Sequence, residues 1–177
     1  MKTTLPTLLF ALCATLLSGC ASHYQLGTTL PPELRDVYIP TILNEGDEPG
    51  VAQALDRALR KEIQREGTLR IVPEEEATTR LEVVVVSYAQ RPVSYRTRDT
   101  QSPNAYRMTI VARVSFVKLA RRESGTVVES TIWQNAALSG SENFAGGADS
   151  VSAKMSCLPQ ASKNLAVSIV DGCVGAW

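Results

Sequence analysis

The feature that most constrains the fold is a stretch, residues 105–119, in which apolar side chains recur at every second position. One face carries Tyr106, Met108, Ile110, Ala112, Val114 and Phe116, and the other carries Arg107, Thr109, Arg113 and Ser115. A period of two predicts a β-strand with one buried and one solvated face. Residues 80–90 and 126–138 flank this stretch and are also rich in β-forming residues. Together the three segments predict an antiparallel meander, followed by a flexible connection at residues 139–149.

Helical spacing flanks the meander on both sides. From residue 51 to Gly67, a glycine typical of a helix end, the apolar positions are Val51, Leu55, Ala58, Leu59 and Ile63. A last helix begins near residue 150, is restarted or kinked by Pro159, and carries an apolar stripe of Leu165, Ala166, Ile169 and Val170. Short strands are expected at residues 36–42, near a sheet edge because Pro40 lacks an N–H, and at 68–72. The predicted fold class is α+β, an antiparallel sheet of about four strands packed against two helices in a single domain.

The N-terminus has the pattern of an export signal. Lys2 precedes an apolar run of 13 residues, Leu5 to Leu17, whereas a membrane-spanning helix needs about 20. The sequence Leu17-Ser18-Gly19-Cys20 resembles a bacterial lipobox, in which the cysteine is acylated; the alternative is an ordinary signal peptide with a chance cysteine. We therefore expect a signal peptide at 1–19, a lipidated tether at 20–35 and the α+β domain at 36–177, held at the membrane by acyl chains on Cys20. No aspartate follows Cys20, which by the bacterial sorting pattern indicates the periplasmic face of the outer membrane.

Charge and residue chemistry exclude several classes of function. The mature chain would carry 17 basic and 18 acidic residues, which argues against nucleic-acid binding. The only histidine, His23, lies in the tether, so no Ser-His or Cys-His pair is available in the domain, and no catalytic motif is present. Cys157 and Cys173 would lie about 24 Å apart on a continuous helix, too far for a disulfide unless the chain folds back at Pro159. We expect no enzyme, no cofactor and no metal site.

One segment is strongly basic. Residues 90–107 join two of the expected strands and hold Arg91, Arg96, Arg98 and Arg107 against Asp99 alone, a local charge of +3, with Tyr95 and Tyr106 interleaved. Arginine side chains suit phosphate and carboxylate, so Arg91, Tyr95, Arg96, Arg98 and Arg107 are the candidate residues for binding a ligand or partner. The other interpretation is a solvated hairpin tip whose arginines discourage edge pairing.

The order of these features resembles a known family. A lipobox cysteine is followed by "SHYQLG", "LPPELRDVYIPTI", the helix "VAQALDRALRKEIQREG", "TLRIV", three long strands and "PQASKNLAVSIVDGCVGAW". This arrangement resembles the LPS-assembly lipoprotein family across the mature chain. The resemblance implies a non-catalytic outer-membrane lipoprotein that partners or plugs the β-barrel translocon of lipopolysaccharide assembly and can contact lipopolysaccharide. The alternative is an accessory lipoprotein, facing the periplasm, of another lipid-transport or secretion complex.

Overall fold

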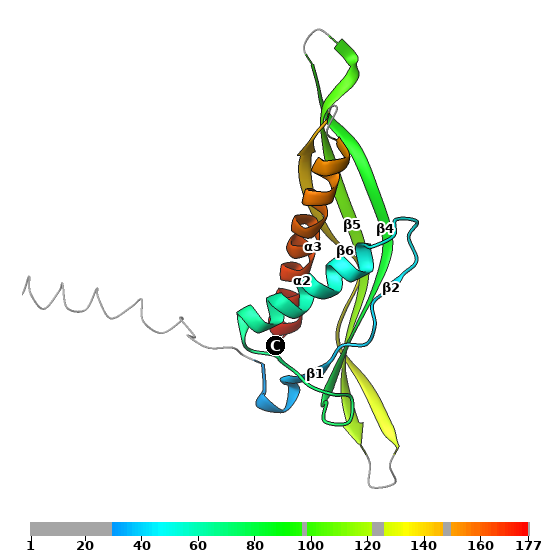
Figure 1. Cartoon of the computed structure of the whole chain (residues 1–177). Coiled ribbons are helices and arrows are strands. Elements are labelled where there is room, and N and C mark those ends of the chain that lie inside the picture. Colours follow the sequence, from blue (N-terminus) through cyan, green and yellow to red (C-terminus); the bar gives the residue numbers. More distant parts are fainter. Residues whose placement is uncertain (1–29, 97–98, 122–125, 147–149, 177) are drawn as a thin grey trace, which may run out of the picture.

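The computed structural model describes residues 30–96, 99–121, 126–146 and 150–176 (Figure 1). Its elements in chain order are η1 (Pro32–Leu34), β1 (Asp36–Tyr38), β2 (Leu43–Asn44), α2 (Val51–Glu66), β3 (Arg70–Ile71), β4 (Thr79–Arg96), β5 (Asp99–Arg121), β6 (Val127–Ala145) and α3 (Ser150–Val174).

The sheet has six strands and is mixed, which corrects the expected antiparallel sheet of about four strands. Its order is β3-β1-β4-β5-β6, and β2 also pairs with β4. The long strands β4, β5 and β6 form the predicted antiparallel meander. The short strands β1, β2 and β3 all pair in parallel. Parallel pairing joins segments separated by a helix or a long crossover, so it leaves no turn signature in the sequence.

Strand β1 lies between β3 and β4, one strand in from the short edge strand β3, in agreement with the expected position near a sheet edge. Strand β1 ends at Tyr38, and Pro40 lies after it, outside any strand. The missing N–H of Pro40 therefore costs no hydrogen bond of the ladder. The edges of the sheet are β6 on one side and the short strands β3 and β2 on the other, since β2 pairs with β4 alone.

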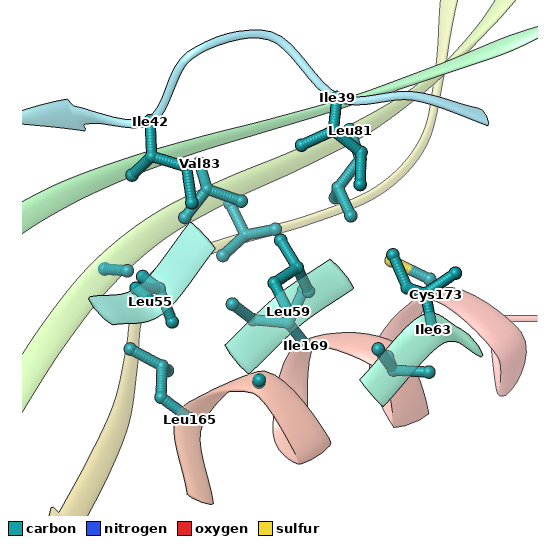
Figure 2. Packing of buried hydrophobic residues seen from close by; sticks show 14 of the residues in the cluster. Ile39, Ile42, Leu55, Leu59, Ile63, Leu81, Val83, Leu165, Ile169 and Cys173 are labelled. Carbon is teal, nitrogen blue, oxygen red and sulfur yellow. The ribbon is translucent and has the colours of Figure 1, made fainter. Parts of the chain in front are cut away.

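The helices α2 and α3 lie side by side on the same face of the sheet (Figure 1). Figure 2 shows Leu55, Leu59 and Ile63 of α2 between Leu165 and Ile169 of α3 and the side chains of β4. The residues on the alternating face of β5 from Met108 to Phe116 are buried, as the period of two predicts. This layered core explains why both helices carry an apolar stripe rather than an apolar surface all round.

The packed domain also begins earlier than residue 36. Leu30 and Leu34, in the segment expected to be a tether, are each 1% exposed and belong to the core. Arg35 fixes this segment by donating from Nε and Nη2 to the carbonyl oxygen of Leu30, at 3.3 and 3.1 Å.

The two helices differ in how they treat the residues expected to interrupt them. Gly67 ends α2 with φ +82°, and its N–H donates to the carbonyl of Ile63 at 3.0 Å, which confirms the predicted stop. Pro159 lies inside α3, which runs as one helix from residue 150 to residue 174 instead of being restarted there.

The close approach of α3 to β6 depends on Gly140. A β-carbon at this position would lie 2.5 Å from the carbonyl oxygen of Ala161 and 2.5 Å from both N and Cβ of Leu165. Since β6 continues to Ala145, the flexible connection expected at 139–149 is wrong for residues 139–145, which are strand; residues 147–149 lie outside the described residues.

Candidate functional site

The basic segment is a paired hairpin and not the loop that we expected. Strand β4 continues to residue 96 and β5 starts at residue 99, and this end of the two strands extends past the start of α3 (Figure 1). Arg91 lies directly opposite Arg107 in the ladder, and Tyr95 lies opposite Pro103. We call the paired segment, residues 90–107, the arginine hairpin.

The arginine hairpin presents two cations on the solvated face of the sheet. Met108 is buried against the helices, so Arg107 points to the opposite face, and Arg91, its cross-strand partner, shares that face. Both side chains are exposed. Arg107 donates from Nε to Oδ1 of Asn143 at 3.0 Å, while Arg91 makes neither a hydrogen bond nor an ion pair among the described residues. Like charges directly opposite one another repel, so a bound anion would stabilise this pair.

Aromatic and apolar groups lie at the same end of the molecule. The ring of Tyr106, on the helix-facing side, stacks on Phe144 with centroids 5.6 Å apart. Val93 and Tyr95 are 44% and 49% exposed. At the start of α3, which lies at this end in Figure 1, Met155 is 72% exposed. This end of the molecule therefore presents cations on the solvated face of the sheet and exposed apolar side chains on the hairpin and at the start of α3, features that suit partners with anionic and apolar parts.

Several predicted site residues cannot be placed. Cys20 and Arg98 lie outside the described residues, and for Arg96 only the backbone, the last residue of β4, is described. The structure therefore brings Arg91, Tyr95 and Arg107 onto one hairpin and says nothing of the others.

The described ranges hold no cluster of three histidine, cysteine, aspartate or glutamate side chains suited to a metal ion. Cys157 and Cys173 are both buried, unpaired thiols on the single helix α3, in agreement with the expectation that they form no internal disulfide. Burial raises the pKa of both thiols, with the Glu142 carboxylate adding to the effect at Cys157. Raised pKa values keep these thiols protonated and unreactive. No helix within the described ranges is long and apolar enough to cross a bilayer.

A second basic feature escaped the sequence analysis. A groove of about 640 Å³ runs between α2 and α3 and is lined by Arg57, Lys61 and Arg65 of α2 and by Lys163 of α3. The first three recur at i, i+4 and i+8, a pattern that is visible in the sequence but gains meaning only once a second helix lies beside it. The proximity of Lys163 depends on how the two helices pack. We call this feature the interhelical groove.

The acid in the interhelical groove, Glu62, is only 4% exposed and is paired with Arg65, whose Nε lies 3.0 and 3.1 Å from the two carboxylate oxygens. This hydrogen bonding holds the pKa of the Glu62 carboxyl below its usual value, against the opposing effect of burial. Four cations against one carboxylate leave the groove with a charge of +3.

The comparisons with known proteins agree with this architecture. No curated protein matches the chain in sequence. In structure the chain is similar to the hypothetical protein CT253 of Chlamydia trachomatis, with 11% identity, 79% of this chain and 98% of that chain covered, and a TM-score of 0.54, which shows a shared fold. A putative lipoprotein of Caulobacter crescentus CB15 shares 12% identity over 75% of this chain and 88% of its own, with a TM-score of 0.45. A minor lipoprotein of Acinetobacter baumannii shares 10% identity over 80% and 92%, with a TM-score of 0.45.

The family assignment comes from the sequence itself. A family model described as LptE, lipopolysaccharide-assembly, matches residues 34–171. This match runs from the end of η1 through most of α3 and so spans nearly the whole packed domain. The chain belongs to the LptE lipopolysaccharide-assembly family.

Proposed function

We propose that this chain is a non-catalytic, lipid-anchored lipoprotein of the outer membrane, which partners or plugs a β-barrel translocon in lipopolysaccharide assembly. The observation that carries the proposal is the family match over residues 34–171. It makes lipopolysaccharide assembly the process in which the packed domain acts, and the remaining observations concern how the domain takes part.

The uncovered face of the sheet supports a position inside a barrel. It carries several ion pairs: Arg80 pairs with Glu82 at 2.8 Å and with Glu129 at 2.7 Å, and Arg113 pairs with Glu45 at 2.9 Å. The interior of an outer-membrane barrel is itself polar, whereas its lipid-facing surface is apolar. An open face that carries these ion pairs is therefore compatible with contact along the polar interior wall of a barrel.

The arginine hairpin supports contact with the phosphorylated glycolipid or with acidic residues of the barrel. Arg91 and Arg107 lie opposite one another on an extended, rigid ladder, with Tyr95 exposed near its end. Charge-assisted hydrogen bonds to such groups contribute about 1.5–3 kcal/mol each when they are shielded from water. Strand pairing holds the backbone of both arginines in place. Binding therefore has to order only the side chains, which lowers its entropic cost.

The anchor is proposed at Cys20, within the lipobox Leu17-Ser18-Gly19-Cys20. Replacing Cys20 by alanine should leave the precursor uncleaved or the product unacylated. Mass spectrometry of the mature N-terminus checks this, and an unmodified cysteine thiol at the N-terminus of the wild-type protein would contradict the anchor.

Co-purification tests the proposal as a whole. The full chain, tagged at its C-terminus, is isolated from detergent-solubilised outer membranes, and its partners are identified by mass spectrometry. A large β-barrel protein recovered in stoichiometric amount is the expected result. Recovery of inner-membrane transporter subunits or of a secretion channel would instead favour the second function, an accessory lipoprotein of another lipid-transport or secretion complex.

A further inference from the structure

The interhelical groove concentrates cations for which the described residues supply no hydrogen bond or ion pair. Most described arginines and lysines make a hydrogen bond or an ion pair, as Arg60 does with Asp56 and Lys154 does with Glu48. Arg57, Lys61 and Lys163 make neither among the described residues, and all three line the groove. The Glu62 carboxylate, which also attracts Lys163, offsets only part of this positive charge. The exposed cations therefore create a positive potential around the groove that would attract an anionic occupant.

The spacing of the cations indicates the form of that occupant. Residues four apart on a helix are separated by about 6 Å along its axis, so Arg57, Lys61 and Arg65 form a row of evenly spaced charges. A single phosphate is held by donors that converge on one point, and this row does not converge. Carboxylates at i and i+4 of a second helix repeat with the same 6 Å spacing and would meet the row in register.

The floor of the interhelical groove permits a helix to approach closely. It is formed by Ala54 and Ala58 of α2 and by Pro159 of α3, which carry small or compact apolar side chains. Helices packed in contact lie about 8–10 Å apart, and small residues at the contact allow the shorter distances. An amphipathic helix could thus place a small apolar face on this floor and its acids beside the cations on the rim.

We propose that the interhelical groove binds an acidic amphipathic helix of a partner protein, with acids at i and i+4 facing Arg57 and Lys61. A second copy of this chain is a poor occupant. In α2 the acids Asp56 and Glu62 are already paired with Arg60 and Arg65, and Glu66 accepts hydrogen bonds from Thr68. Helix α3 carries one acid, Asp171, and so has no pair of acids at i and i+4. The inference goes beyond the proposed function, because it concerns a helical partner and a different surface from the arginine hairpin.

The first test uses the full chain in detergent and a fluorescent synthetic peptide that carries glutamates at i and i+4 and alanines on its other face. Fluorescence anisotropy should show binding by the wild type that weakens about tenfold in Lys61→Glu, because one attraction becomes a repulsion. The matched control is Lys118→Glu, the same charge change at an exposed residue of β5 outside the groove, and it should bind as the wild type does. Equal weakening in both variants would show a response to net charge alone and would overturn the proposal.

Two further measurements address specificity. A peptide with lysines in place of the glutamates should bind the double variant Arg57→Glu/Lys61→Glu and not the wild type, and failure of this exchange contradicts the proposed register. Vesicles of phosphatidylglycerol provide the lipid comparison: binding that depends on Lys61 for the vesicles but is absent for the peptide would assign the groove to a lipid phosphate instead. Thermal midpoints of all variants should match that of the wild type, because the substituted side chains are exposed.

In cells, a photo-reactive amino acid at Gln160, on the α3 side of the interhelical groove, is expected to capture the natural partner. The captured segment should carry acids at i and i+4, and capture should be lost in Lys61→Glu and retained in Lys118→Glu. A captured segment without that pattern would refute the helix assignment, even if the barrel partner of the proposed function is recovered normally by co-purification.

Discussion

Replacing Gly140 by alanine should separate α3 from the sheet. The added methyl carbon would lie 2.5 Å from three atoms of α3, two of them backbone atoms, where an ordinary contact begins at 3.4 Å. Backbone atoms of a helix cannot rotate away as the end of a side chain can. The helix would have to shift as a body, and Leu165, which is fully buried at this contact, would lose part of its packing.

The magnitude follows from two opposed effects. Overpacking a well-packed core costs about 1–3 kcal/mol, and the upper end applies here because the obstacle is backbone. Alanine also lowers the entropy of the unfolded chain and returns about 0.4–1 kcal/mol. The expected net loss is about 2 kcal/mol, which for a domain of this size lowers the thermal midpoint by about 4–8 °C.

Chemical denaturation of the full chain in detergent measures this loss, with Gly46→Ala as the matched control. At Gly46 the nearest atom to an added β-carbon is the side-chain oxygen of Asn44, at 3.4 Å, and the backbone φ is not positive. The control should be as stable as the wild type or slightly more stable. If Gly140→Ala and Gly46→Ala had equal stabilities, the close contact between α3 and β6 would be wrong.

Three further predictions concern the core, the buried acid and the arginine hairpin. Leu59→Ala should cost about 2–5 kcal/mol, because this side chain is fully buried between α3 and the sheet. Gln64→Ala, at an exposed position of the same helix, should be nearly neutral. Equal denaturation midpoints for the two variants would contradict the assignment of the Leu59 face of α2 to the core. Arg65→Met should lower stability at neutral pH, because the carboxylate of Glu62, which is 4% exposed, loses its hydrogen-bond donor. In the wild type this stabilisation is present above the unfolded-state pKa of glutamate and is lost as the pH falls through the lowered folded-state pKa, so denaturation followed from neutral to acid pH should show the two proteins converging. Arg91→Ser/Arg107→Ser should leave the thermal midpoint unchanged while weakening binding to purified lipopolysaccharide and reducing its salt sensitivity; unaltered binding at low and high salt would leave these arginines as a solvated hairpin tip.

The sequence by itself determined the elements whose signal is local. The alternation along residues 105–119 predicts the buried face of β5, and Gly67 marks the end of α2, because both depend on neighbouring residues only. The separation of Cys157 and Cys173 on one helix likewise follows from helical rise, and the two thiols are unpaired. The order of elements was enough to indicate the LPS-assembly family, which the family model confirms over residues 34–171.

Only the tertiary structure decided which distant segments meet. The parallel pairing of β1, β2 and β3 depends on crossovers that bury their strands beside β4, and no turn residue marks such pairing in the chain. The arginine hairpin was expected to be a loop because its residues are mostly polar and show no apolar alternation. In the structure the pairing between β4 and β5 continues through these residues, so they are strand. The interhelical groove needs Lys163 beside the row that begins at Arg57, and that proximity arises from packing two apolar stripes on one face of a sheet. Periodicity in a sequence reports which face of an element is buried, whereas the partner that buries it is selected by shape and volume across the whole domain.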